Sequence, residues 1–201
     1  YYPIVLGHEF SGEVVETGSQ VKNLRIGDRV TGAPLIPCFQ CDNCQKGDYS
    51  LCKSYSFIGS RIQGSYAQYL KLSERNAVKI DSNVSFEQGA LIEPSTVALH
   101  GLRRGGYRGG KDVAILGGGT IGLFTAQWAR IFGAKRVFVL DIDNDRLTLA
   151  KKLGADYTMN TLHEGFREQM EEMTKGKGFD FIFETAGADA TIKLTFELAG
   201  N

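Results

Sequence analysis

The sequence has 201 residues, of which 42% are hydrophobic and 23% charged, as in a soluble globular protein of one large or two small domains. Its 23 basic and 23 acidic residues give a net charge of zero, so composition gives no support to broad electrostatic binding of nucleic acid or an anionic membrane. There is no recognisable signal peptide and no apolar run of about 18 residues, so no membrane-spanning helix is expected.

Residues 12–80 contain short β-prone runs separated by glycine turns. We predict strands at Gly12–Glu16, in the turn-to-strand run Ile26–Val30, and at Gly64–Leu70. Several short strands of this kind indicate a small barrel-like β domain, which we place at residues 1–95.

From about residue 86 the pattern changes to helices that alternate with continuous apolar strands. In chain order we predict a helix at Phe86–Leu102, a strand at Asp112–Leu116, a helix at Ile121–Phe132, a strand at Arg136–Leu140, a helix at Arg146–Leu153 and a strand at Phe179–Phe183. This alternation is typical of a doubly wound parallel sheet with helices on both faces. We therefore predict a second, α/β domain at residues 96–201.

The four cysteines all lie within one short segment, at Cys38, Cys41, Cys44 and Cys52. Four thiolates that turn onto one ion make the closed tetrahedral shell of a structural zinc site, which leaves no position for substrate. Two disulfides, buried free thiols and an iron–sulfur cluster are the alternatives. The tight grouping favours structural zinc and a reducing, cytoplasmic location.

Gly117, Gly119 and Gly122 form a G-x-G-x-x-G motif directly after a predicted strand and before a predicted helix. The first glycine permits a tight turn, the second lets the backbone approach a pyrophosphate, and the third allows the helix to pack closely on the strand. The helix N-terminus would face the phosphate charge. In this context the motif predicts dinucleotide binding.

Asp141 ends the second predicted strand of this domain, where a carboxylate can accept hydrogen bonds from ribose hydroxyls and would repel a 2′-phosphate. Because Ile142 and not an arginine follows it, we predict NAD in preference to NADP; the alternative is that Asp141 caps the next helix. The loop at Glu184–Gly187 is either a cofactor-side loop or an ordinary glycine turn. The expected cofactor-binding residues are Gly117, Gly119, Thr120, Ile121, Gly122, Asp141, Arg146 and Thr185.

Three further metal-ligand side chains, His8, Glu9 and Glu93, are far apart in the sequence. Spacing alone does not make them a site, because a single histidine is more often an ordinary surface or core residue than a ligand.

The order of Gly7-His8-Glu9-Phe10-Ser11-Gly12, the four-cysteine segment and the Gly117 motif resembles the zinc-containing medium-chain dehydrogenase/reductase (alcohol dehydrogenase) family, along the whole chain. Glu93-Pro94 is similar to its polyol dehydrogenase branch, in which a glutamate replaces a cysteine zinc ligand. The segments 1–4, 37–39, 55–61 and 92–94 resemble a member of that branch that acts on a polyol phosphate.

The resemblance implies a partial GroES-like β-barrel catalytic domain at 1–95, a partial NAD-binding Rossmann domain at 96–201, and a homodimer or homotetramer. It implies a catalytic zinc ion held by His8, Glu93 and an upstream cysteine outside this sequence, with Glu9 as a neighbouring or exchangeable ligand. The sequence opens at Tyr1 without an initiator Met and stops at Asn201 without closing an element, so we expect a longer parent enzyme.

The implied reaction transfers a hydride from a secondary alcohol of a polyol or polyol phosphate to NAD. Arg61 is our candidate for a phosphate group of the substrate, and a surface ion pair is the alternative role. Other dehydrogenases of the same branch, acting on sorbitol or xylitol, butanediol or threonine, are alternatives. A non-catalytic NAD-binding zinc scaffold is a competing class, whereas a zinc-knuckle nucleic-acid module is disfavoured by the absence of net positive charge.

Overall fold

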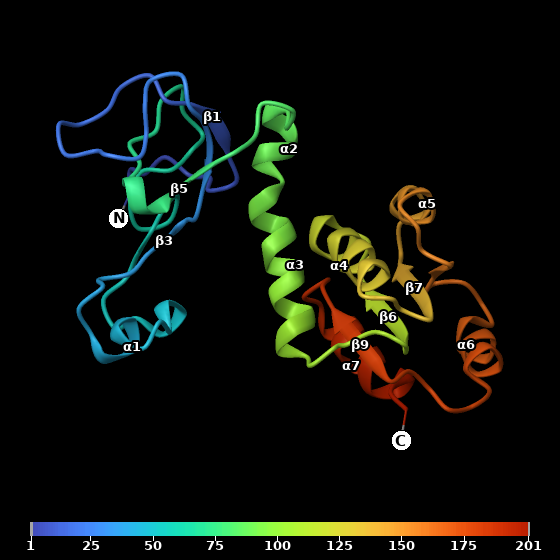
Figure 1. The fold of residues 1–201 in the computed structure, drawn as a ribbon. Helices are drawn as coiled ribbons and strands as arrows, with labels where there is room; N and C mark the ends of the chain where they lie inside the picture. The colour runs from blue at the N-terminus through green and yellow to red at the C-terminus, as the bar shows by residue number, and fades with distance from the viewer. Residues whose placement is uncertain (1, 201) are drawn as a thin grey trace. The chain divides into compact units, whose positions relative to one another are not determined.

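The computed structural model describes residues 2–200 of the chain (Figure 1). They form two compact units that divide between Glu93 and Pro94, within the long helix α3 (Ile92–Arg104). Each unit is described separately below.

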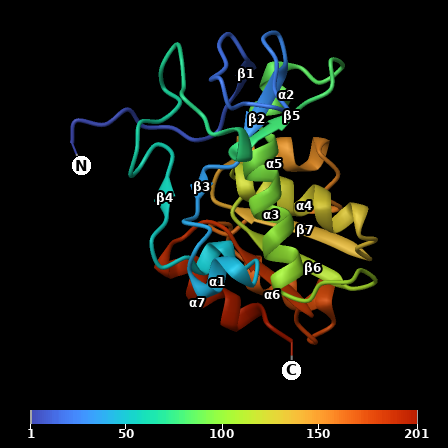
Figure 2. The ribbon, with the colours of Figure 1, turned by 60° about the vertical axis from the view of Figure 1, so that its left-hand side comes forward.

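The first unit is built from short antiparallel strands. β1 (Ser11–Glu13), β2 (Arg29–Gly32) and β5 (Ala77–Lys79) form one sheet in the order β1-β2-β5, and β3 (Leu35–Ile36) pairs with β4 (Ser56–Phe57). Figure 2 shows β3 and β4 leading to the lobe that holds α1 (Asp42–Gln45). The side-chain amide of Asn76 donates to the carbonyls of Ala33 and Leu35, both at 2.8 Å, and so holds the chain between β2 and β3. The remaining helices of the unit are the 3-10 turns η1 (Tyr49–Leu51) and η2 (Glu74–Asn76) and the short α2 (Phe86–Ala90).

The strand expected at Gly64–Leu70 is wrong, because this part of the described chain is irregular. The backbone N–H groups of three consecutive residues, Gly64, Ser65 and Tyr66, donate to the carbonyls of residues 5, 7 and 6. A strand ladder would direct alternate N–H groups to opposite sides, so bonds from three successive residues to one segment exclude a regular strand.

The single helix expected from Phe86 to Leu102 is divided at Leu91 into α2 and α3. Ser85 caps α2 with a full capping box, in which Gln88 N–H donates to its hydroxyl at 3.2 Å. Pro94 explains the division, because proline has no N–H to bond to the carbonyl of Ala90, and its ring would clash there.

The second unit contains a parallel sheet in the order β8-β7-β6-β9. Its strands are β6 (Asp112–Leu116), β7 (Arg136–Asp141), β8 (Tyr157–Asn160) and β9 (Phe181–Glu184). The chain runs outward from β6 through β7 to β8 and then returns to the other side of β6 as β9. The strand order therefore reverses between β6 and β9, which is where open α/β sheets bind ligands.

Helices cover both faces of this sheet (Figure 1). Alternation along β6 explains the two layers: Val113 and Ile115 pack with residues of α4 (Thr120–Ile131) and α5 (Asn144–Lys152). Ala114 and Leu116 pack with residues of α6 (Phe166–Thr174) and α7 (Asp189–Leu198) on the other face. Because both faces are buried, the strand reads as a continuous apolar run. The prediction of a doubly wound sheet is confirmed.

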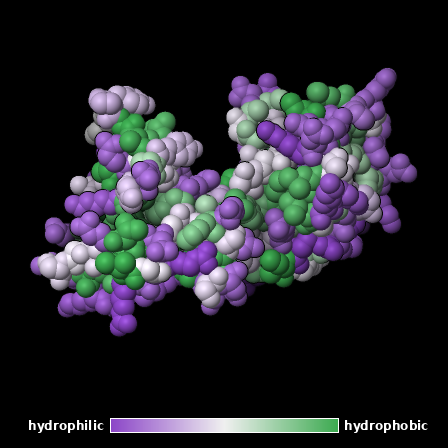
Figure 3. All heavy atoms as spheres, turned by 90° about the horizontal axis from the view of Figure 1, so that it is seen from above, coloured by the Kyte–Doolittle hydropathy of each residue, from purple (hydrophilic) through white to green (hydrophobic). Residues whose placement is uncertain are grey.

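On the face seen in Figure 3, each unit carries both hydrophilic and hydrophobic residues. Among residues 2–200, no helix has the length and apolar character needed to cross a bilayer.

Candidate metal centres and dinucleotide site

The four cysteines meet in the lobe that contains α1 and η1. Their sulfur atoms all lie within 4.8 Å of one another, with Cys38 and Cys44 at 3.9 Å and Cys41 and Cys44 at 3.6 Å. A disulfide would require about 2.05 Å. A tetrahedron with zinc–sulfur bonds of about 2.3 Å has edges of about 3.8 Å, so the observed spacing fits a four-thiolate zinc site.

Backbone N–H groups stabilise negative charge on two of the cysteines in this lobe. The N–H groups of Lys53 and then Cys44 lower the pKa of Cys41 to about 6, and the N–H of Cys38 lowers the pKa of Cys52. Burial, followed by the neighbouring thiols, raises the pKa of Cys44 to about 12. A divalent cation that displaces the proton of Cys44 would allow all four sulfur atoms to bind it as thiolates, so metal binding at this lobe is expected to release protons.

A second cluster brings together His8, Glu9 and Glu93, whose ligand atoms also lie within 4.8 Å of one another. His8 and Glu9 precede β1, and Glu93 lies in the first turn of α3. α2 connects the two regions: the hydroxyl of Ser11 donates to the carbonyl of Phe86. All three side chains belong to the first unit.

The second cluster places two carboxyl groups beside one imidazole. Burial raises the pKa of Glu93, the nearby His8 lowers it, and the negative charge of Glu9 raises it further. The His8 ring is held edge-on against Phe57, with the ring centroids 5.3 Å apart. One imidazole and two carboxylates within this distance fit the ligand chemistry of an open zinc site, which needs three protein ligands and a free position.

The glycine turn lies between β6 and α4 and has the geometry that its motif predicts. Gly117 has φ +108°, a value that side chains rarely adopt, and its N–H donates to Leu140 O at 2.8 Å. A Cβ on Gly122 would lie 1.8 Å from Gly117 O, so only glycine fits. A Cβ on Gly119, the N-cap of α4, would meet no described atom within 4 Å, which leaves open space in front of the helix for a phosphate.

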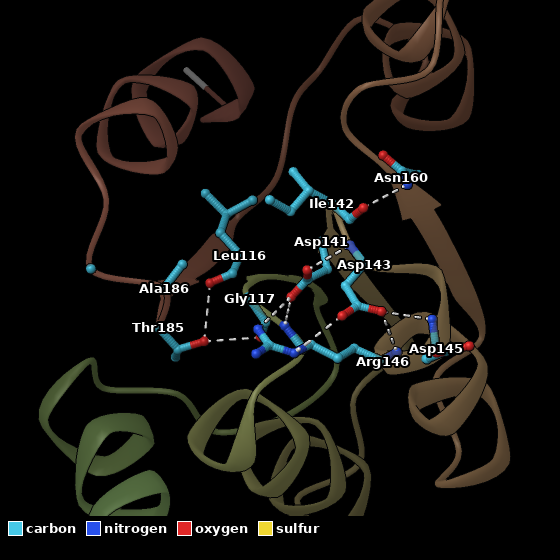
Figure 4. A network of polar contacts seen from close by, with 12 residues as sticks. Leu116, Gly117, Asp141, Ile142, Asp143, Asp145, Arg146, Asn160, Thr185 and Ala186 are labelled. Atoms are coloured by element: carbon cyan, nitrogen blue, oxygen red, sulfur yellow. Dashed lines mark hydrogen bonds and ion pairs between the residues drawn. The ribbon is translucent and has the colours of Figure 1, made fainter.

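Asp141 is buried at the end of β7 and bonds to the glycine turn (Figure 4). Its Oδ2 accepts from the N–H of Gly118 at 2.5 Å, and its Oδ1 accepts from the N–H of Asp143 at 2.9 Å. The alternative that Asp141 caps the next helix is wrong, because Asp143 is the N-cap and accepts from Asp145 N–H at 2.8 Å and from Arg146 N–H at 3.3 Å. The bond to Gly118 was not foreseen from the sequence.

Thr185 follows β9 on the opposite side of the turn. Its hydroxyl lies 3.0 Å from Leu116 O and 3.1 Å from Gly117 O, and donates to these carbonyls. The adjacent Glu184 accepts from the N–H groups of Ala186 and Gly187, both at 2.9 Å. The loop is a glycine turn, with Gly187 at φ +69°, and it also lies against the G-x-G-x-x-G turn. Its geometry is therefore compatible with both a cofactor-side loop and an ordinary glycine turn.

The other expected cofactor residues surround the same turn. Thr120 and Ile121 begin α4, and Arg146 lies in the first turn of α5. The Arg146 guanidinium is 3.8 Å from Asp141 Oδ2 and 3.9 Å from Asp143 Oδ2 (Figure 4). The structure thus gathers all eight expected residues at the carboxyl edge of the sheet, where the strand order reverses.

Arg61 is not part of an ion pair among the described contacts. Its guanidinium lies 3.9 Å from the centre of the Tyr55 ring and donates to Tyr55 O at 3.0 Å. This stacking fixes the side chain in the segment that follows β4, the strand whose Phe57 contacts His8.

A separate cavity of about 690 Å³ lies along β8, between α5 and α6, and includes Lys151, Lys152 and His163 in its lining. None of the residues expected to bind zinc or the dinucleotide lines it.

Comparison with known proteins agrees with these features. Residues 1–82 match the alcohol dehydrogenase GroES-like domain, and residues 120–201 match the zinc-binding dehydrogenase domain. The chain is 44% identical over 201 residues to galactitol 1-phosphate 5-dehydrogenase of Escherichia coli strain K12, covering 100% of this chain and 58% of that protein. It is 35% identical over 192 residues to sorbitol dehydrogenase of Bacillus subtilis strain 168, covering 95% of this chain and 54% of that one.

Solved structures give the same relationship. The crystal structure of the Escherichia coli galactitol-1-phosphate dehydrogenase superposes with a TM-score of 0.91 at 44% identity, over 100% of this chain and 58% of that chain. A crystal structure from Sinorhizobium meliloti 1021, assigned to the zinc-binding dehydrogenases and bound to NADP, gives 0.92 at 36% identity, over 100% of this chain and 59% of that chain. The chain thus spans between half and two thirds of these relatives. With its GroES-like domain, its zinc-binding dehydrogenase domain and these relatives, the chain belongs to the zinc-containing medium-chain alcohol dehydrogenase family.

Proposed function

We propose that the protein containing this chain is a zinc-dependent, NAD-linked dehydrogenase of a polyol or polyol phosphate, with galactitol 1-phosphate as substrate and tagatose 6-phosphate as product. The observation that carries the proposal is the convergence of His8, Glu9 and Glu93, a ligand set for an open metal site, in a chain that also carries a dinucleotide turn.

In this proposal His8, Glu93 and an upstream cysteine outside this sequence would hold the catalytic zinc ion, with Glu9 as a neighbouring or exchangeable ligand. When bound, zinc supplies a Lewis acid for the substrate alkoxide, and NAD supplies the hydride acceptor. A ring nitrogen of neutral His8 would donate its lone pair to the metal, and the two carboxylates would offset the charge of the ion. The contact of Phe57 with the His8 ring limits rotation of the imidazole.

The second metal site, made by Cys38, Cys41, Cys44 and Cys52, has a structural role in this proposal. Four thiolates close the coordination shell and leave no position for an alcohol oxygen. The ion would connect α1 and η1 in a lobe where, between residues 38 and 55, the only buried side chains are two of its own ligands, Cys44 and Cys52. The same cysteines, grouped as a metal site and not paired as disulfides, support a cytoplasmic location.

For the cofactor, we propose that Gly117, Gly119 and Gly122 shape the pyrophosphate turn and that Asp141 selects NAD. Each Asp141 oxygen already accepts one backbone bond and retains a further acceptor site for a ribose hydroxyl. A 2′-phosphate would be repelled by this carboxylate. Arg146 lies close enough to moderate that repulsion, so NADP is expected to bind more weakly and not to be excluded.

For the substrate, we propose that Arg61 binds the phosphate group. Stacking on Tyr55 leaves one face of the guanidinium and part of its donor edge available for a two-point contact with phosphate oxygens. Sorbitol or xylitol, butanediol and threonine are the alternative substrates, and a sorbitol dehydrogenase and an L-threonine 3-dehydrogenase are also relatives of this chain.

The test is the kcat/KM of the full-length protein with NAD on galactitol 1-phosphate, free galactitol, sorbitol, 2,3-butanediol and threonine. We expect galactitol 1-phosphate to be preferred, and Arg61→Ala to lower its kcat/KM by about tenfold or more while leaving free galactitol unchanged. Arg75→Ala is the matched control, since Arg75 also stacks on a ring, 4.8 Å from the centre of Phe39. An equal loss on both substrates would remove the phosphate role.

A non-catalytic NAD-binding zinc scaffold is the competing class, and it predicts no turnover on any member of that panel. The presence of all three ligand side chains in one cluster favours the enzyme. A homodimer or homotetramer is our proposal for the assembly, to be checked by light scattering on the full-length protein.

A further inference from the structure

The backbone just before His8 is enclosed by another part of the chain. Gly7 has φ +94°, and a Cβ there would lie 2.4 Å and 2.7 Å from two ring carbons of Tyr66 and 2.8 Å from the hydroxyl of Ser65. Only glycine therefore fits at this position, and the peptide that leads into His8 has a single tolerated path.

Two more glycines complete the enclosure. A Cβ on Gly59 would lie 2.3 Å from Gly7 O, and a Cβ on Gly64 would lie 2.4 Å from Gly7 O and 2.5 Å from Leu6 O. The obstructing atoms are backbone atoms, which cannot turn aside as a flexible side chain does. Two segments that are distant in sequence, residues 5–7 and 59–66, thus meet at Gly7 with no room for a methyl group between them. We call this meeting point, made by Gly7, Gly59 and Gly64, the glycine junction.

Hydrogen bonds hold the junction together. Residues 64, 65 and 66 donate their N–H groups to the carbonyls of residues 5, 7 and 6, at 2.7, 2.9 and 2.9 Å. Val5 N–H donates to the side-chain carbonyl of Gln63 at 2.7 Å. The segment from Gly59 to Tyr66 therefore binds residues 5–7 through backbone hydrogen bonds and through the side chain of Gln63.

The same segment begins beside the His8 side chain. Phe57, two residues before Gly59, places its ring edge-on to the His8 imidazole. The peptide before His8 and the ring of His8 are thus both set by residues 57–66. Among the described contacts the His8 side chain makes no hydrogen bond that would fix its orientation independently, so the junction helps to define where its imidazole lies relative to Glu9 and Glu93.

We infer that Gly59 and Gly64 are positioning residues of the His8–Glu9–Glu93 metal site: because neither carries a side chain, their backbone packs directly on the peptide of Gly7 and so sets the imidazole that follows within reach of both carboxylates. The inference rests on the proposed function in requiring a metal ion at this cluster. A purely structural junction would instead affect the folding of the whole unit, including the four-cysteine lobe.

The experiment uses the full-length protein with both zinc ions exchanged for cobalt(II). Gly64→Ala is the informative variant, because Gly64 has no left-handed φ and the added methyl meets only the crowded backbone. Gly18→Ala is the control, since a Cβ there would meet no described atom within 4 Å. Each ion is titrated against a chelator, and the d–d absorption of the His8 site is recorded separately from that of the four-thiolate site.

We expect Gly64→Ala to weaken the ion at the His8 site by about 10- to 100-fold and to change its d–d spectrum, with the four-cysteine ion and the Gly18→Ala protein unchanged. Wild-type affinity and an unchanged spectrum in Gly64→Ala would overturn the inference while leaving the proposed function intact. A wild-type protein that binds one ion only, at the cysteines, would overturn both.

If Gly64→Ala does not fold, Gln63→Ala decides the question, because it removes the side-chain bond to Val5 and adds no atom. A smaller loss of affinity confined to the His8 site supports the inference. Equal binding of both ions in Gln63→Ala and wild type contradicts it.

Discussion

The carboxylate of Asp141 accepts a 2.5 Å hydrogen bond from the backbone N–H of Gly118. The residue expected to recognise the ribose therefore also holds the glycine turn that receives the pyrophosphate. Two parts of the candidate dinucleotide site, at the ends of β7 and β6, are therefore connected through one buried side chain.

Replacing Asp141 by Ser should weaken NAD binding by about tenfold or more, because a charged acceptor for the ribose is lost and the turn at Gly118 is loosened. The discrimination against NADP should fall at the same time, since the repulsion of a 2′-phosphate is removed while Arg146 remains. Dissociation constants of both cofactors, measured by titration calorimetry, check this. Asp145→Asn, on the exposed side of α5, is the control, and an unaltered NAD/NADP ratio in the Asp141 variant would contradict the prediction.

Gly122→Ala should abolish measurable NAD binding and destabilise the second unit. A methyl group there would lie 1.8 Å from Gly117 O, so either the turn or the start of α4 must move. Gly101→Ala is a matched helical control with no described atom within 4 Å of its Cβ, and it should raise stability by up to about 1 kcal/mol. Retained cofactor affinity in Gly122→Ala would show that the turn is not where the dinucleotide lies.

Asp112→Asn tests the paired charges at the start of the sheet. Arg136 donates to Asp112 through Nε at 3.0 Å and Nη2 at 2.5 Å, and both side chains are largely covered. These bonds lower the pKa of Asp112, so its stabilising contribution is present above the ordinary value of 3.8 and is lost as the pH falls through the lower folded value.

Chemical denaturation should therefore give a loss of about 1–3 kcal/mol for Asp112→Asn at pH 7, and a smaller difference from wild type below about pH 4. The exposed pair of Lys111 and Asp180, 3.1 Å apart, is the control, and Asp180→Asn should cost less than about 1 kcal/mol. If the difference in unfolding free energy between wild type and Asp112→Asn grew as the pH fell, the predicted role of the Asp112–Arg136 pair would be contradicted.

Cys44→Ser should remove the structural zinc ion and destabilise the cysteine lobe, because Cys44 is buried and its sulfur lies within 3.9 Å of those of Cys38 and Cys41. Limited proteolysis should then cut between residues 38 and 52 faster than in wild type. Ser54→Ala, just outside the cluster, is the control. Undiminished zinc content in Cys44→Ser would argue against a four-thiolate site.

Much of the second unit was predictable because its signals are local. The apolar run from Val113 to Leu116 and the glycines that follow it specify a buried strand and a tight turn, and both are found. β8, α6 and α7 were missed. β8 is a short edge strand of mixed polarity, and α6 depends on the spacing of Phe166, Met170 and Thr174, which becomes informative only once they are seen to cover one face of the sheet.

The candidate metal site was predictable only in part. Cys38 to Cys52 lie close together in sequence, so their convergence could be argued from spacing. His8 and Glu93 are brought together by tertiary packing, and only the family resemblance linked them beforehand. The glycine junction has no sequence signature, because Gly59 and Gly64 look like ordinary turn glycines until their backbones are seen to press on Gly7.

The most direct test of the central claim is the metal content of the full-length protein and of its His8→Ala variant, measured by atomic emission after dialysis against metal-free buffer. Two zinc ions per chain in wild type, and one in His8→Ala together with loss of dehydrogenase activity, is the predicted result. One ion in both proteins, or full turnover in His8→Ala, would contradict a catalytic zinc ion at His8, Glu9 and Glu93.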